Sequence, residues 1–326
     1  MPLNLHPYTS PLYDYMHNFD LIHSYFSTSN CDYQIICPDG LDWEEEKIVE
    51  IVVRVCKDLN IDPQKVQISS NVVYSSDTGI KFVEHTSLLV QMFADSMQND
   101  YFEKQKDASY FLSMTNNPVW DRLCVASFLY KYHRSRSKIK FPLHDDYVQR
   151  GLGIDSAFAK YYTHKDRARQ ILDFLPALPI DDIKEKWTKE ELEKDIVHNQ
   201  SQFRSHDLYK TVAVEIVNET NITKGFFVTE KTARPIAYYT PFVIMATPNF
   251  LKNLRILGFK TFGTVWDESY DRFEGKDRLE KIYLTINEIS RIDPEDIQKQ
   301  THDICVYNKS VLDSYQWKNK FKDIKV

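Results

Sequence analysis

The sequence predicts an α/β protein of two domains, each built as a doubly wound parallel sheet with helices on both faces. Three observations lead to this fold class. At 326 residues the chain is about twice the length of a common single domain. Short apolar runs alternate with segments of helical periodicity, which is typical of parallel sheets. Hydrophobic residues (42%) and charged residues (27%) have the balance of an ordinary globular protein that buries a large core.

The first domain is predicted over residues 1–105. An apolar run from Tyr33 to Pro38 predicts a strand, and the stripe formed by Ile48, Val52, Val55 and Leu59 predicts the helix that follows it. Further strands are predicted at 66–69 and 80–83, and a helix at 87–97. A charged stretch at 99–107 then interrupts the pattern, so we place the domain boundary there.

The second domain is predicted over residues 106–290, with a bracing tail at 291–326. Strands are expected at 109–114, 138–142, 211–217, 225–228 and 241–246. Helices are expected after the Asn-Asn-Pro turn at 116–118, at 155–172 and 188–198, and from Thr229 and Pro248 onward. Sevenfold spacing of Ile297, Ile304 and Val311 predicts helices in the tail, which we expect to pack back across both domains.

Composition excludes several classes of protein. With only eight glycines and no glycine-rich phosphate motif, any bound phosphate must be held by side chains and a helix amino terminus. A net charge of −6 argues against a protein whose main affinity comes from neutralising a nucleic-acid backbone. Five scattered cysteines without a C-x-x-C favour reduced thiols. No long apolar run occurs, so we expect a cytoplasmic protein without a membrane partner, in the host cytoplasm if the chain is viral.

The strongest candidate binding motif is Thr229-Glu230-Lys231, which directly follows a predicted strand and opens a helix. Ligands of doubly wound sheets collect at this position. A carboxylate there can accept both hydroxyls of a ribose, and a lysine with the helix dipole can neutralise a diphosphate. The same three residues also make an ordinary capped first turn with a solvated ion pair.

Arg122 is the second candidate, one turn into the helix after the strand at 109–114. Its guanidinium can grip a phosphate bidentately, although a surface arginine is the simpler interpretation. Asn116 and Asn117 precede that helix and can either contact a ligand or cap the helix.

Three stretches together resemble a known family. They are FLSMTNNPVWDRL (111–123), VEIVNET (214–220) and the block from FFVTEKTARPIAYYTPFV (226–243) to WDESYD (266–271). They are similar to phage and giant-virus glycosyltransferases related to the α-1,3-fucosyltransferase fold. The resemblance covers about residues 108–290 and implies the GT-B arrangement of two facing Rossmann-like domains, with an inverting reaction.

The resemblance also implies roles for individual residues. Glu230 would hold the donor ribose, Lys231 and Arg122 the diphosphate, Asn218 or Glu219 the edge of the donor pocket, and Phe227 a face of the nucleobase. The order of Asn218-Glu219 inverts the Glu-Asn pair of the fucosyltransferases. The nucleotide-sugar would be a co-substrate, and no cofactor is implied.

We expect catalysis without a metal ion, because no Asp-x-Asp occurs and Lys and Arg can stabilise the departing diphosphate. An inverting displacement also needs a base within reach of the acceptor hydroxyl. The candidates lie in the first domain: Asp39 and Asp42 after its first predicted strand, and the pair Glu84-His85. Each of them also has an ordinary structural interpretation.

The acceptor stays open at the level of sequence. The run 131–140 contains five Lys or Arg, and Arg134, Arg136, Lys138 and Lys140 are candidates for DNA contact, as in the glycosylation of hydroxymethylated pyrimidine in viral DNA. The same run can be the solvated end of a helix. Alternatives are a glycan, lipid or protein acceptor, or a non-catalytic nucleotide-binding or DNA-binding accessory protein with the same fold.

Overall fold

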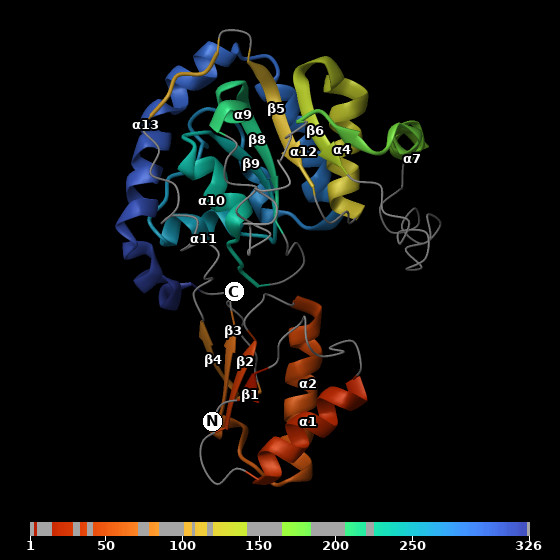
Figure 1. Ribbon diagram of the computed structural model, residues 1–326, viewed down its shortest axis with the longest axis vertical. Helices are drawn as coiled ribbons and strands as arrows, with labels where there is room; N and C mark the ends of the chain where they lie inside the picture. Colours follow the sequence, from red (N-terminus) through yellow and green to blue (C-terminus); the bar gives the residue numbers. More distant parts are fainter. Residues whose placement is uncertain are drawn as a thin grey trace, which may run out of the picture.

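The computed structural model describes residues 3–4, 15–28, 33–37, 42–70, 78–84, 101–105, 108–115, 120–141, 165–183, 206–219 and 225–324. These residues form two sheets with separate hydrophobic cores, one made of residues up to Phe82 and one of residues from Phe102 onward. Figure 1 shows the first sheet and its helices in red and orange and the second in yellow to blue. The predicted α/β class is confirmed.

The first sheet has four parallel strands in the order β1-β2-β3-β4. Because the order follows the chain, right-handed crossovers carry the connecting helices to one face. Helices α1 and α2 pack against each other on the same side of the sheet (Figure 1). The described helices therefore cover one face, and the predicted winding on both faces is not seen here among the described residues. The bounds are β1 (Leu3–Asn4), α1 (Tyr15–Thr28), β2 (Tyr33–Cys37), α2 (Asp42–Asp58), η1 (Pro63–Lys65), β3 (Val66–Ser70) and β4 (Lys81–Glu84).

The second sheet is doubly wound, as predicted. Its order is β7-β6-β5-β8-β9, with all neighbours parallel except β7, which runs antiparallel to β6. The bounds are β5 (Ser109–Met114), α4 (Trp120–His133), η2 (Arg134–Arg136), β6 (Ser137–Phe141), α7 (Lys165–Phe174), η3 (Leu175–Ala177), β7 (Ile180–Asp181), α9 (His206–Lys210), β8 (Val212–Asn218), α10 (Glu230–Ala237), β9 (Phe242–Met245), α11 (Phe250–Ile256), η5 (Ser269–Arg272), α12 (Gly275–Ile289), α13 (Pro294–Ser314) and η6 (Gln316–Asp323).

The strand order reverses between β5 and β8, because the strands that follow β5 and β8 in the chain are added on opposite sides of this pair. From β5 it crosses through α4 to β6 on one side, and from β8 it crosses through α10 to β9 on the other. Right-handed crossovers in opposite directions place α4 and α10 on opposite faces. Accordingly, α4 packs with α12 and α7, while α10 packs with α13 (Figure 1). The point between β5 and β8 is therefore the topological switch point of the sheet.

Most predicted elements from residue 109 onward are present. The strand predicted at 109–114 is β5, and the strands predicted at 138–142, 211–217 and 241–246 are β6, β8 and β9, with each end differing by one residue. The strand predicted at 225–228 is wrong, because only Phe226 forms an isolated bridge there. Helices α1, α9 and α12 and strands β1 and β7 were not predicted. The helices predicted at 87–97 and 188–198, and the first part of the one predicted at 155–172, lie outside the described residues.

The carboxy-terminal tail is helical and joins the second core. Helix α13 begins with Pro294, and the Asp293 carboxylate accepts the amide of Glu295 at 2.9 Å as its cap. Ile297, Cys305 and Leu312 are buried in the second core. The described contacts of the tail thus brace the second sheet through α10 and β8, and contact with the first domain stays a prediction.

Candidate functional site

Polar side chains gather where the central strands of the second sheet end. Strand β8 is buried over its whole length, yet it ends in Asn218 and is followed by Glu219, which are 3% and 0% exposed. Strand β5 ends one residue before Thr115, which is 3% exposed. The carboxyl ends of parallel strands share one edge, so these residues lie at the switch point, where doubly wound sheets bind ligands.

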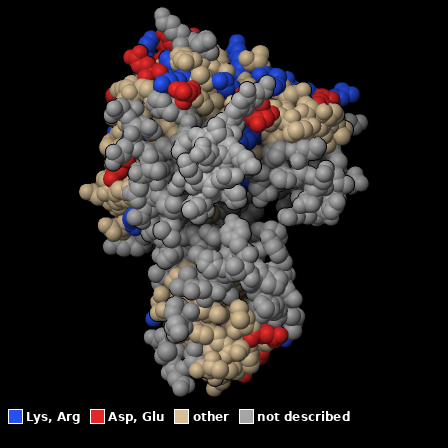
Figure 2. All heavy atoms as spheres, viewed as in Figure 1, with Lys and Arg blue, Asp and Glu red and all other residues tan. Residues whose placement is uncertain are grey.

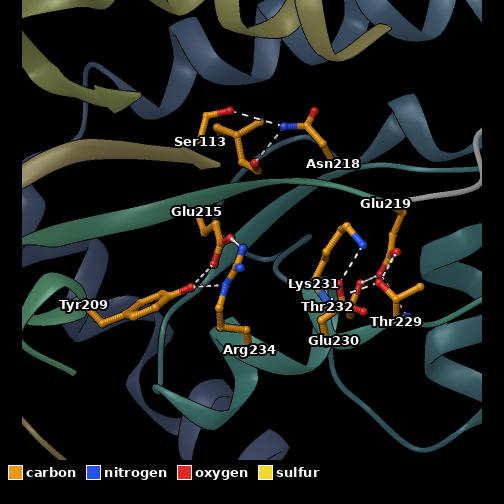
Figure 3. A network of polar contacts seen from close by, with 11 residues as sticks. Ser113, Tyr209, Glu215, Asn218, Glu219, Thr229, Glu230, Lys231, Thr232 and Arg234 are labelled. Atoms are coloured by element: carbon orange, nitrogen blue, oxygen red, sulfur yellow. Dashed lines mark hydrogen bonds and ion pairs between the residues drawn. The ribbon is translucent and has the colours of Figure 1, made fainter. Parts of the chain in front are cut away.

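Glu219 connects β8 to the first turn of α10. Its Oε1 accepts the amide of Thr229 at 3.2 Å and the hydroxyl of Thr232 at 2.5 Å, and its Oε2 accepts the hydroxyl of Thr229 at 2.6 Å. Thr229 is the N-cap of α10, and its Oγ1 accepts the amide of Lys231 at 3.2 Å. Figure 3 shows this cluster at the start of α10. A fully buried carboxylate therefore sets the position of the predicted Thr-Glu-Lys motif.

Arg122 reaches the same point from the opposite face. The residue is 4% exposed, and its Nη2 donates to the main-chain oxygen of Glu219 at 2.8 Å. Glu219 thus holds α10 through its carboxylate and Arg122 through its carbonyl. The structure brings together Arg122, Glu219 and the Thr229–Lys231 turn, which the sequence had indicated as separate motifs.

Glu230 and Lys231 form an ion pair beside this point. Lys231 Nζ lies 2.7 Å from Glu230 Oε1, with the lysine side chain 24% exposed and the glutamate side chain 8% exposed. Burial acts to raise the pKa of Glu230, but the charge and hydrogen bond of Lys231 outweigh it and bring the pKa below its ordinary value. Glu230 is therefore ionised at neutral pH and is a hydrogen-bond acceptor.

A second polar cluster, missed by sequence reasoning, anchors the rest of α10. The buried guanidinium of Arg234 contacts Glu215 Oε1 and donates from Nε to the hydroxyl of Tyr209 at 2.7 Å, and that hydroxyl donates to Glu215 Oε2 at 2.5 Å. Figure 3 shows this cluster on the same side of β8 as Glu219. The available signal was a glutamate inside an otherwise apolar strand, since buried charges are paired.

Three buried side-chain oxygens at this edge have no hydrogen-bond partner among the described residues: Thr115 Oγ1, Asn218 Oδ1 and Thr247 Oγ1. They lie at or just beyond the ends of three neighbouring strands, β5, β8 and β9. The other atom of the Asn218 amide, Nδ2, donates to Ser113 Oγ at 3.2 Å (Figure 3). Buried polar groups are rarely left without a partner, so three in one row are notable.

Two further features of the second domain are the burial of Phe227 and an apolar cavity. Phe227 is only 6% exposed, which leaves little of its ring for stacking on a nucleobase. A small cavity lies between α10, α11 and the carboxy-terminal helices rather than at the strand ends. Its lining is apolar throughout, which is typical of a packing defect.

Several predicted residues can be placed only in part. Asp42 begins α2 after β2, and Glu84 ends β4, so both lie at the carboxyl edge of the first sheet. Asp39, His85 and Asn116 lie outside the described residues.

The basic run lies mainly at the opposite edge of the second sheet. Arg134 and Arg136 follow the end of α4 and precede β6, and Lys138 is the second residue of that strand. Arg134 makes a bidentate pair with Asp182, at 2.5 and 2.8 Å, and Arg136 donates to the carbonyl of Ser290 at 3.1 Å.

Two of the lysines of the run contact other side chains, and the third lies within strand β6. Lys131 pairs with Asp173 at 3.1 Å, and Lys138 donates to Thr211 at 2.6 Å. Only Lys140 lies in the later half of β6, where it pairs with Met114. On the face seen in Figure 2, blue Lys and Arg atoms are interspersed with red Asp and Glu atoms.

Within the described ranges, no group of three or more His, Cys, Asp or Glu is arranged to hold a metal ion. Among the helices of the described part, none is long and apolar enough to cross a membrane. The side chains of Cys56, Cys124 and Cys305 are buried. Comparison of the chain with protein-family models, with curated proteins and with solved structures found no match.

Proposed function

We propose that this protein is an inverting, metal-independent glycosyltransferase that binds its nucleotide-sugar donor at the carboxyl edge of the second sheet. The observation that carries the proposal is the double role of Glu219, whose carboxylate orients the start of α10 and whose carbonyl holds Arg122. Arg122 of α4 and the first turn of α10 are thereby both tied to Glu219, at the switch point between β5 and β8. This is where a doubly wound sheet presents a nucleotide site.

The chemistry of these groups fits a nucleoside diphosphate. Loss of the diphosphate from a sugar develops negative charge, which Arg122 and Lys231 would stabilise. Glu230 stays ionised and would accept hydrogen bonds from the two hydroxyls of a ribose. Binding would then draw Lys231 from Glu230 toward the phosphates, and the diol would replace the lysine on the carboxylate.

The acceptor hydroxyl needs a base, which we assign to the carboxyl edge of the first sheet. Asp42 and Glu84 occupy that edge, and Asp39 and His85 are their neighbours in sequence. A carboxylate or imidazole from this group would take the proton while the sugar carbon is attacked. This step requires the two carboxyl edges to face one another, as in the GT-B arrangement.

A glycan, lipid or protein acceptor is favoured over DNA by the position of the basic run. Arg134 is neutralised by Asp182, and Arg134, Arg136 and Lys138 lie at the edge away from the proposed donor site. A DNA backbone bound by these three side chains would not bring a base to Glu230 and Lys231. Transfer to hydroxymethylated pyrimidine in DNA would need a different contact surface.

The test is donor binding by the purified protein. UDP, GDP, CDP, ADP and their sugars are screened for thermal stabilisation with EDTA present, and the binding constants are measured by calorimetry. Lys231→Ala is compared with Lys252→Ala, a lysine in the first turn of the next helix along, α11. The starts of both helices are held by a carboxylate. Glu219 accepts the amide of Thr229 at α10, and Asp271 accepts the amides of Leu251 and Lys252 at 2.9 and 3.0 Å at α11, so the two variants differ in the position of the lysine.

We expect one nucleotide to bind without a metal ion, Lys231→Ala to weaken it about tenfold or more, and Lys252→Ala to leave it unchanged. Binding without sugar transfer to any acceptor would favour the non-catalytic accessory protein. If no nucleotide binds, or if the two variants lose affinity equally, the donor site is wrongly placed.

A further inference from the structure

The three partnerless oxygens form a row along one face of the second sheet. Strands β5 and β8 pair with a constant offset of 103 positions, as in Phe111 with Val214, which places Thr115 opposite Asn218. Residues opposite one another in a ladder share a face. On β9, Met245 pairs with Asn218 of β8. Thr247 lies two positions after Met245, just beyond the end of β9.

This face is not the one that carries α10. Side chains alternate along a strand, so Asn218 points away from Glu215 and Glu219. Figure 3 shows Ser113 and Asn218 on one side of β8 and the contacts of α10 on the other. The row therefore lies on the side of α4, the helix that supplies Arg122.

The chemistry of the row selects the ligand group. Asn218 Nδ2 is already used as a donor to Ser113 and to the carbonyl of Ile216, so the remaining atom, Oδ1, can only accept a hydrogen bond. A phosphate oxygen at neutral pH is also an acceptor and cannot satisfy it. A hydroxyl group can, and it can also donate to or accept from the two threonines.

We infer that Thr115, Asn218 and Thr247 bind hydroxyl groups of the transferred sugar. The inference rests on the proposed function, in which Glu230 holds the ribose on the α10 side and Arg122 and Lys231 hold the diphosphate at the switch point. The sugar then extends from the diphosphate to the α4 side, where the row is. A nucleobase N–H is the other source of a neutral donor and is distinguished by the experiment.

The test uses threonine-to-valine changes, which keep the shape of the side chain and remove only the hydroxyl. Thr115→Val and Thr247→Val break no hydrogen bond among the described residues, so both should fold and melt at or above the wild-type temperature. Thr285→Val is the matched control, since its buried hydroxyl donates to main-chain oxygens of Asp267 and Lys281, away from the row. It should lower the melting temperature without altering ligand affinity.

Binding constants are measured by calorimetry for UDP, GDP, UDP-glucose, UDP-galactose, GDP-mannose and GDP-fucose. We expect each of the two valine variants to bind a nucleotide-sugar about tenfold more weakly, because one hydrogen bond is lost and a ligand hydroxyl is left buried. Each variant should bind the parent diphosphate as tightly as the wild type does.

Each other outcome overturns the inference in a recognisable way. Equal weakening of the diphosphate and its sugar would assign the row to the nucleotide base or phosphates. If the valine variants bind the diphosphate and its nucleotide-sugar as the wild type does, the row is not part of the donor site. The same holds if the wild-type protein binds a diphosphate but none of the four nucleotide-sugars. Either result leaves the proposed function standing. If the wild-type protein binds no diphosphate, the proposed function fails and the inference fails with it.

Discussion

Replacing Glu219 by glutamine tests whether one buried carboxylate organises the candidate site. From described residues of α10 and its cap, the carboxylate accepts three hydrogen bonds, from the amide of Thr229 and from the hydroxyls of Thr229 and Thr232. In Glu219→Gln the amide nitrogen must replace one oxygen. If the amide nitrogen takes the position of Oε1, it faces the N–H of Thr229, and two donors then oppose each other. The nitrogen should therefore take the position of Oε2, where the hydroxyl of Thr229 loses its acceptor.

The magnitude follows from the number and kind of bonds. A hydrogen bond to a charged group contributes about 1.5–3 kcal/mol. The variant loses one such bond, and the two bonds to Oε1 weaken because their acceptor is no longer charged. The free energy that holds the first turn of α10 should therefore fall by about 2–4 kcal/mol. The Gln residue still offers its main-chain oxygen to Arg122. The loss should therefore be concentrated at α10 and not at α4.

Hydrogen exchange with mass spectrometry resolves this difference. In Glu219→Gln, amides at the start of α10 should exchange at least about thirtyfold faster, as about 2 kcal/mol requires, while amides of β3 in the first sheet keep their wild-type rates. Nucleotide affinity should fall along with this protection. Wild-type exchange at Thr229–Thr232 would refute the argument that Glu219 holds the helix.

Two further predictions concern buried charges near α10. Arg234→Met leaves Glu215 buried without its cation and should lower the free energy of unfolding by about 3–5 kcal/mol, measured by urea denaturation. Combining Arg234→Met with Glu215→Gln should recover most of this loss. Equal stability of the single and double variants would contradict the ion pair. Burial lowers the pKa of Lys104 to about 7, against opposing contributions from Cys305 and Glu215. Because the unfolded chain holds this proton up to about pH 10.4, it binds more protons than the folded chain above pH 7, and the free energy of unfolding should rise with pH by up to about 1.4 kcal/mol per unit. Urea denaturation at pH 7.5 and 8.5 should show this rise in the wild-type protein and a smaller one in Lys104→Met, and parallel changes in the two proteins would contradict it.

The linker between the two sheets is attached to the second one through this lysine. Lys104 Nζ donates to the carbonyl of Tyr209 at 2.8 Å and to Thr240 Oγ1 at 2.6 Å, and the amide of Gln105 donates to the carbonyl of Lys210 at 2.8 Å. Tyr101 packs edge-on against Tyr239 and His302. Residues 101–105 thus belong by contact to the second sheet, although the charged stretch around them was the predicted boundary.

Local sequence was sufficient for the elements and for one half of the candidate site. Strand β5 follows from its apolar run, and the start of α10 follows from Thr229, because an apolar run and a threonine cap are each encoded within a few residues. The strand predicted at 225–228 failed for the opposite reason. Its apolar residues are buried by packing without making a ladder, and periodicity does not distinguish the two.

By itself, then, the sequence determined the α/β class, most strand and helix positions, and the identity of Arg122, Glu230 and Lys231 as chemically suited to a diphosphate and a ribose. Only the tertiary structure decided that Arg122 and the first turn of α10 are both held by Glu219. Arg122 and Glu219 are 97 positions apart, and their contact depends on the order β7-β6-β5-β8-β9. The burial of Phe227, the pairing of Arg134 with Asp182 and the row of partnerless oxygens were decided there too. Periodicity and capping are local properties of the chain, whereas strand order and side-chain partners are set by contacts between segments far apart in sequence.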